Sequence, residues 1–210
     1  MNKEGIRRTV LFGMAFLLFG FASMSPSAAG EPWSRIEEDW ELRLNQPEAI
    51  SNSPQITIYM TPNVSKLATY FQLQLNHAAD VNFSEGGFRV SAIVDETALD
   101  GARSGTQGLL TYDGDIIRWT SVMAVRDNQI YFAIKDGTSM SWGDFGGPEY
   151  LLSIPSGEIK DLSGYTPKQS IKDVDIGFGR NRIEALTLKR VRAFREDGSS
   201  VLVETAFETF

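Results

Sequence analysis

Apolar and polar residues alternate along much of this chain, a pattern typical of β-strands that bury one face. In residues 40–44, for example, Trp40, Leu42 and Leu44 alternate with charged or polar residues. The same alternation is found in residues 56–60, 71–76, 88–94, 117–125, 130–134, 151–154, 174–178, 183–194 and 201–207. The sequence therefore predicts about ten strands and an all-β fold.

Turn-forming pairs separate these segments. Asp127-Asn128 predicts a tight hairpin, and Asp197-Gly198 predicts another. Strands at this spacing, with no long helical pattern between them, predict an antiparallel sandwich. Two stretches fit more than one structure, because residues 64–75 also carry a helical stripe and the alternation shifts phase twice within 183–194. We interpret the second stretch as a bulged strand rather than a short helix.

Residues 1–29 have the three parts of a secretory signal peptide. Basic residues up to Arg8 precede an apolar run at 10–22, and small residues lead to Ala29. The run is shorter than the twenty or so residues of a membrane span. We expect cleavage after Ala29, by the general secretory rather than the twin-arginine route. The mature chain, 30–210, is then a single periplasmic or extracellular domain without membrane insertion.

The absence of cysteine and the acidic net charge argue against several covalent attachments and classes of ligand. The chain has no cysteine, so neither a disulfide nor a lipid anchor is expected. Its net charge of −7 becomes −9 once the signal peptide, with a net charge of +2, is removed. An acidic chain of this kind argues against nucleic acid and anionic lipid as ligands.

One local cluster of basic residues departs from this acidic character. Its members fall within sixteen residues near the C-terminus: Arg180, Arg182, Lys189, Arg190, Arg192 and Arg195. The cluster has two interpretations, a strand face that pairs with acidic neighbours or a binding patch for an acidic polysaccharide.

Several segments resemble a known fold family. Residues 174–183 read Val-Asp-Ile-Gly-Phe-Gly-Arg-Asn-Arg-Ile and, with residues 186–192, resemble the late strands of laminin-G-like and concanavalin A-like jelly rolls. Residues 71–76 and 87–94 are similar to early strands of that fold, and Trp142–Gly146 resembles a motif of secreted bacterial sandwiches. The resemblance implies a two-sheet antiparallel jelly-roll sandwich. It leaves function open, because this architecture carries lectins, glycanases, lyases and adhesive modules.

The sequence gives little support to catalysis. The single histidine, His77, stands at a strand end, and the chain has no nucleophile elbow for a triad. The jelly-roll glucanases that this fold resembles carry Glu-x-Asp-x-Glu or Glu-x-Asp-x-x-Glu on one strand. Residues 37–41 are acidic, but we expect them to lie ahead of the first strand. Asp173-Val174-Asp175 lacks glutamate partners.

The favoured function is a non-catalytic binding module with a glycan as ligand. The glycine-rich stretch 136–169 is longer than an ordinary connection and contains Trp142 and Asp144. Tyr112 adjoins the turn residue Asp113. We predict that sugar rings stack on Trp142 and Tyr112, and that Asp144 and Asp113 bind the hydroxyl groups.

Three points stay open at this stage. No metal site is predicted, although calcium held by Asp113 and Asp115, or by Asp95 and Glu96, is an alternative to their use as turn residues. A polysaccharide hydrolase or lyase on the same fold, and a self-associating structural envelope protein, are the alternative functions. The oligomeric state is left undetermined.

Overall fold

The computed structural model describes residues 31–45, 54–76, 87–104, 108, 110 and 112–208. The predicted signal peptide and His77 lie outside these residues. Among the described residues, no helix has the length and apolar character needed to cross a membrane.

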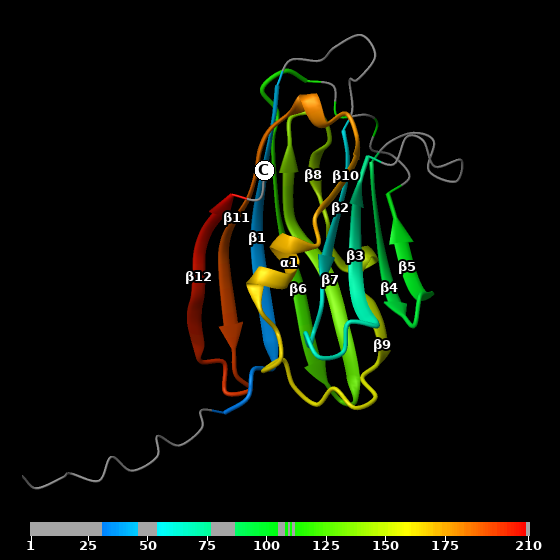
Figure 1. Cartoon of the computed structure of the whole chain (residues 1–210), viewed down its shortest axis with the longest axis vertical. Coiled ribbons are helices and arrows are strands. Elements are labelled where there is room, and N and C mark those ends of the chain that lie inside the picture. The colour runs from blue at the N-terminus through cyan, green and yellow to red at the C-terminus, as the bar shows by residue number, and fades with distance from the viewer. Residues whose placement is uncertain are drawn as a thin grey trace, which may run out of the picture. The chain divides into compact units, whose positions relative to one another are not determined.

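Two antiparallel sheets form a sandwich, which confirms the predicted fold class (Figure 1). The large sheet has the order β12-β11-β1-β6-β7-β8, with β9 also paired to β7, and the small sheet has the order β10-β2-β3-β4-β5. The strands of the large sheet are β1 (Arg35–Leu44), β6 (Ile116–Arg126), β7 (Gln129–Ser139), β8 (Gly143–Phe145), β9 (Leu152–Pro155), β11 (Ile183–Phe194) and β12 (Ser200–Glu208). Those of the small sheet are β2 (Gln55–Met60), β3 (Thr69–Leu75), β4 (Phe88–Val94), β5 (Thr97–Arg103) and β10 (Asp175–Phe178).

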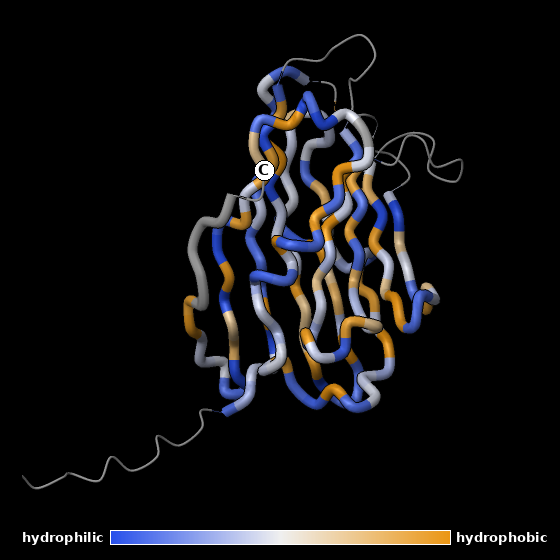
Figure 2. The backbone as a smooth tube through the Cα atoms, in the orientation of Figure 1, coloured by the Kyte–Doolittle hydropathy of each residue, from blue (hydrophilic) through white to orange (hydrophobic). Residues whose placement is uncertain are grey.

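The core lies between the sheets and follows from the alternation. Inward residues of most strands are buried, and Figure 2 shows apolar residues recurring along the strands. Trp40 and Trp119 are both buried and pair across β1 and β6, with stacked rings whose centroids are 6.1 Å apart. Phe71 of the small sheet stacks on Phe132 of the large sheet at 4.8 Å. These contacts join the two sheets into one apolar interior.

Two hairpin turns use left-handed backbone. Asp127 and Asn128 have φ values of 51° and 58° and join β6 to β7 as predicted. Asp95 and Glu96, with φ values of 47° and 64°, form a similar turn between β4 and β5. Strand β5 was not predicted, because its residues are mostly exposed and therefore show no apolar alternation.

Strand β1 corrects one prediction. It begins at Arg35, so the acidic residues 37–41 lie within the first strand and not ahead of it. The prediction was wrong because Glu38 occupies an inward position, where the alternation requires an apolar residue. The neighbouring strand β11 is continuous and bulged, as predicted, with Lys189 as the extra residue between the pairs Asp39–Arg190 and Trp40–Leu188.

Short elements connect the strands. They are the helix α1 (Pro167–Lys172) and the single turns η1 (Pro148–Tyr150) and η2 (Arg180–Arg182). The long stretch 136–169 supplies β8 and β9 at one edge of the large sheet. It then leads to α1, which contacts β2 (Figure 1).

Candidate functional site

The outer face of the large sheet carries four rows of side chains that face each other across β11, β1, β6 and β7. Read from β11 through β1 and β6 to β7, the first three rows are Phe194-Arg35-Ala124-Tyr131, Arg192-Glu37-Val122-Ala133 and Arg190-Asp39-Thr120-Lys135. The fourth row, read from β11 to β6, is Thr187-Glu41-Arg118. Neighbouring rows are two residues apart along a strand, about 7 Å. The first two rows combine aromatic and short apolar side chains with Arg35, Glu37 and Arg192, whereas the last two contain only charged side chains and threonines.

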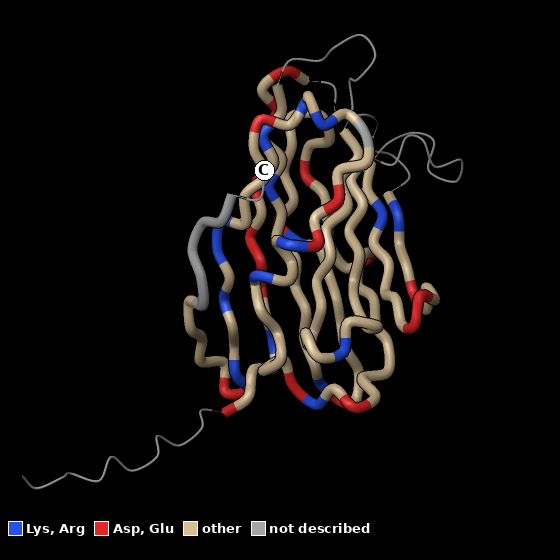
Figure 3. Tube along the Cα trace, viewed as in Figure 1, with Lys and Arg blue, Asp and Glu red and all other residues tan. Residues whose placement is uncertain are grey.

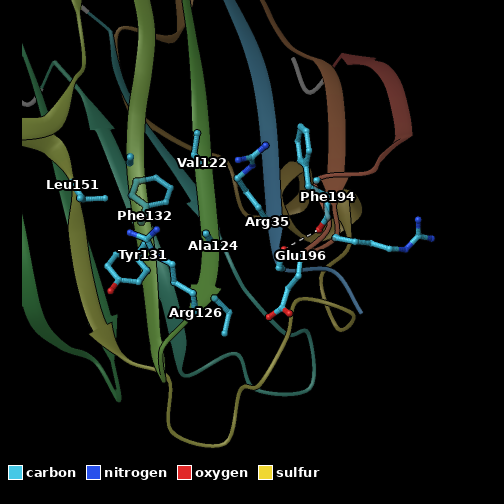
Figure 4. A pocket seen from close by; sticks show the side chains of 14 residues that line it. Arg35, Val122, Ala124, Arg126, Tyr131, Phe132, Leu151, Phe194 and Glu196 are labelled. Carbon is cyan, nitrogen blue, oxygen red and sulfur yellow. Dashed lines mark hydrogen bonds between the residues drawn. The ribbon is translucent and has the colours of Figure 1, made fainter. Parts of the chain in front are cut away.

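A groove of about 570 Å³ lies over the first two rows (Figure 4). Its floor consists of the short side chains of Val122, Ala124 and Ala133, which leave space between longer neighbours. On one side the guanidinium of Arg35 lies 3.9 Å from the ring centroid of Phe194. On the other side the guanidinium of Arg126 lies 4.6 Å from the centroid of Tyr131. We call this hollow, with its lining residues, the arginine–aromatic groove.

A second hollow of about 720 Å³ lies over the charged rows, and we call it the charged hollow. Its lining residues are Asp39, Trp40, Glu41, Arg118, Trp119, Thr120, Lys135, Asp136, Lys189, Arg190 and Arg192. The bulge in β11 accounts for much of its basic character, because Lys189 and Arg190 are consecutive and both exposed. Figure 3 shows the basic residues recurring along β11.

Each outward carboxylate of β1 is held by cations. Glu37 pairs with Arg192 at 2.8 Å and with Lys135 at 3.1 Å. Asp39 pairs with Arg190 at 2.6 Å. Arg192 also lies 3.5 Å from Asp39 and links these two carboxylates into one ion-pair network, whereas Glu41 forms a second network with Arg43, Arg118 and Lys189.

Glu41 shows the electrostatic effect of its network most clearly. Burial acts to raise the pKa of Glu41, but hydrogen bonds from Arg43 and Arg118 and the charge of Lys189 outweigh it and lower the pKa below the ordinary value. The two hydrogen bonds are 2.9 and 2.8 Å long. Glu41 is therefore ionised at neutral pH.

Basic residues outnumber acidic ones around the two hollows. The eight basic lining residues are Arg35, Arg118, Arg126, Lys135, Lys189, Arg190, Arg192 and Arg195, and the four acidic ones are Glu196, Asp39, Glu41 and Asp136. Counting Glu37, which lies beneath this surface, the face still has a surplus of three positive charges. The whole chain, in contrast, has a net charge of −7.

The run Glu37-x-Asp39-x-Glu41 has the glucanase spacing and lies on a strand, contrary to the sequence prediction. All three side chains face the outside, but their exposed fractions are only 6%, 19% and 8%. A retaining glycosidase needs one carboxyl with a raised pKa as its general acid. The cations around Glu41 have the opposite effect, which disfavours this chemistry.

The structure places Trp142 at the end of the core. Its ring packs against Phe88 and, edge to face, against Phe145, with centroids 6.1 and 5.5 Å apart. Its indole N–H donates a 2.7 Å hydrogen bond to the carbonyl of Gly108. Trp142 is half-buried and its single polar group already has a partner.

The other three predicted site residues are exposed. Tyr112 is 55% exposed, and its backbone N–H donates to the Ser141 hydroxyl at 3.4 Å, which brings it near Trp142 in the fold. Asp113 follows it, whereas Asp144 lines a separate hollow of about 580 Å³ with Asp136 and Glu149 among others. None of the four predicted residues lines the arginine–aromatic groove or the charged hollow.

Two of the alternative calcium donors, Asp115 and Asp95, have structural roles. Asp115 is fully buried and accepts hydrogen bonds from the Ser139 hydroxyl at 2.9 Å, the Met140 N–H at 2.8 Å and the Ser141 hydroxyl at 2.6 Å. Asp95 is the first residue of the β4–β5 turn. Within the part of the chain that the structure describes, no group of three or more His, Cys, Asp or Glu residues is arranged to hold a metal ion.

The members of the basic cluster lie in two different environments. Lys189, Arg190 and Arg192 face the outside and pair with the carboxylates of β1, which confirms a salt-bridged strand face. Arg182, in contrast, is buried and donates to the carbonyl of Tyr112 at 3.2 Å. The sequence pattern found this face but did not identify its partners from β1, β6 and β7.

Comparison with known proteins adds a likeness of fold. No protein-family model matches the sequence, and no curated protein matches it. Two solved structures of scytalido-glutamic peptidase, one with a transition state analog inhibitor and one with a peptide based transition state analog, have TM-scores of 0.34 and 0.33. Both are 10% identical to this chain and cover 85% of it and 82% of their own length. The likeness concerns the two-sheet sandwich alone.

Proposed function

We propose that this protein is an exported, non-catalytic binding module whose ligand is a glycan. The observation that carries the proposal is the arginine–aromatic groove on the outer face of the large sheet. A small apolar floor between two arginine–aromatic pairs offers flat surfaces to the C–H faces of sugar rings and donors to their oxygens. The signal-peptide pattern of residues 1–29 supports the export part of the proposal.

The groove favours a polymer over a small compact ligand. It is open along the sheet, and the charged hollow continues the same face, since both are lined by residues of β1, β6, β7 and β11. Small-molecule sites, in contrast, are concave pockets that enclose most of the ligand. A chain of sugars lying on the sheet would contact several rows at once.

A glycan array with the mature chain tests this proposal. Ala124→Phe fills the floor of the groove without touching the core, and we expect it to weaken glycan binding about tenfold or more, which corresponds to about 1.4 kcal/mol. Ser91→Phe is the matched control, because Ser91 is a small residue on the outward side of β4 in the small sheet. It should leave binding unchanged.

The same array distinguishes the groove from the predicted loop site. If Trp142→Ala abolishes binding while Ala124→Phe does not, the ligand lies at Trp142, Tyr112, Asp113 and Asp144. The exposure of Tyr112 beside Ser141 is the observation that supports this second location. If the mature chain binds no glycan and self-associates in gel filtration, the structural alternative replaces both.

A polysaccharide hydrolase is the second candidate function. The Glu37-x-Asp39-x-Glu41 run on the outer face of β1 favours it, although the ion pairs of these residues do not. Release of reducing ends from polysaccharides by the wild-type chain, and its loss in both Glu37→Gln and Glu41→Gln, would establish this activity. Binding without product formation would support the non-catalytic module.

A further inference from the structure

We infer that the glycan is acidic, and that its carboxylate or sulfate groups bind the basic side chains of the arginine–aromatic groove and the charged hollow. This inference rests on the proposed function and specifies its ligand class. The starting observation is that a chain with net charge −7 concentrates a positive surplus on one sheet face.

Two arginines of the groove have no carboxylate partner. Among the described residues, neither Arg126 nor Arg195 forms an ion pair, and both lie over aromatic rings instead. The guanidinium of Arg126 is 4.6 Å from the centroid of Tyr131, and that of Arg195 is 4.6 Å from the centroid of Trp33. Arg195 also donates hydrogen bonds to the carbonyl of Glu31 at 3.2 Å and to the Ser199 hydroxyl at 3.3 Å. The remaining in-plane N–H donors of the two guanidinium groups match a carboxylate or sulfate.

The cations of the charged hollow differ from Arg126 and Arg195, because they already pair with carboxylates. The basic residues of this hollow exceed the carboxylates that they surround, and Glu41 alone is approached by Arg43, Arg118 and Lys189. An anionic group on the ligand would therefore share cations that already converge on this site. The side chains of these cations are 47%, 54% and 47% exposed, so they keep donors in solvent that a ligand can use without releasing Glu41.

The length of the face fits a polymer with repeated acidic groups. From the row of Arg35 to the row of Glu41 the sheet extends six residues along β1, about 20 Å. The unpaired arginines lie at one end and the charged hollow at the other. A ligand that contacts both ends must carry more than one acidic group.

Matched polymers that differ only in charge test the inference. We would measure binding of the mature chain to polygalacturonate and its fully methyl-esterified form, and to dextran sulfate and dextran. The acidic member of at least one pair should bind about tenfold more tightly than its neutral partner. Its binding should weaken at about 1 M salt, where the Debye length falls to about 3 Å.

Substitutions test which basic residues bind the acidic polymer. The double variant Arg126→Gln/Arg195→Gln removes two guanidinium groups that form no ion pair among the described residues, although Arg195 loses its hydrogen bonds to Glu31 and Ser199. It should lower affinity for the acidic polymer about tenfold. Lys168→Gln is the control, because Lys168 is an exposed cation on α1, which contacts β2 of the small sheet. It should have no effect.

The outcomes separate the two proposals. Equal affinity for the acidic and neutral members of both pairs would overturn the acidic ligand while leaving glycan binding intact. Equal affinity for an unrelated polyanion, single-stranded DNA, would also overturn it. Binding to no polymer here and to no glycan on the array would refute the proposed function itself.

Discussion

The two faces of strand β1 place acidic residues in opposite environments. Glu38 points into the sandwich and is fully buried, whereas Glu37, Asp39 and Glu41 point outward. Among the described residues, the inner carboxyl meets only uncharged donors, and the outer ones meet arginines and lysines. One strand thus carries a structural acid on one side and a charged surface on the other.

The Glu38 carboxyl binds α1 and the connection that leads to it. One oxygen of Glu38 accepts hydrogen bonds from the hydroxyls of Tyr165 and Ser170, both at 2.6 Å, and the other accepts from the Trp40 indole at 2.9 Å. Burial raises the pKa of Glu38 above its ordinary value of 4.5, although the three donors act to lower it. Burial, together with the nearby Glu38 carboxyl, raises the pKa of Tyr165 well above 10.0.

The difference shows which environment suits which role. Without a cation, a buried carboxyl is stabilised by hydrogen bonds that fix the chain around it, and its ionised form is disfavoured. With several half-exposed cations, a carboxyl stays ionised and its partners remain accessible to a ligand. We therefore assign a structural role to the inner face, and the outer face is the one for which we propose recognition.

The largest effect is expected at Glu38. Glu38→Ala leaves three buried donors without an acceptor and creates a cavity, so the free energy of unfolding should fall by about 3 kcal/mol or more. Glu38→Gln keeps the volume and a carbonyl acceptor, and should cost about 1 kcal/mol or less. Denaturant unfolding of the two variants measures the difference. Equal losses in both would show that charge, and not hydrogen bonding, is what Glu38 contributes.

The pH dependence of stability is the next effect. Because the folded-state pKa of Glu38 is raised, its contribution to stability is complete below about 4.5 and is lost as pH rises through the folded-state pKa. Glu38→Gln should therefore gain stability relative to the wild type as pH increases from about 4 to about 8. The measurement is the free energy of unfolding of both proteins across this range. Parallel curves would contradict the prediction.

Much of the fold follows from the alternation in the sequence, and the errors of the prediction have physical causes. Strands with one buried face, such as β3, β6 and β7, were predicted within a few residues, and β11 was correctly interpreted as bulged. Strand β5 was missed because neither face shows a regular burial pattern. The start of β1 was missed because Glu38 interrupts the apolar phase, and only its partners Tyr165 and Ser170, far away in the sequence, explain why it is buried.

The candidate site was harder to predict. The basic residues of β11 were noticed, but the groove also needs Arg35 and Arg126, which are far apart in the sequence and meet only through strand pairing. Short floor residues such as Ala124 carry no chemical signal of their own. The signal available was the alternation of acids at positions 37, 39 and 41, which indicates an outward charged face once β1 is extended to Arg35.

The smallest effect is expected on the outer face. Glu41→Gln removes a charge held by Arg43, Arg118 and Lys189, whose side chains are 47%, 54% and 47% exposed. Solvent screens such pairs and their long side chains lose entropy when held, so the free energy of unfolding should fall by only about 1 kcal/mol. The loss should shrink at about 1 M salt, whereas that of Glu38→Ala should not, because the inner cluster contains no ion pair. Denaturant unfolding at both salt concentrations makes the comparison. A loss from Glu41→Gln that is large and independent of salt would mean that the outer carboxylates are structural as well, which would remove the distinction between the two faces of β1.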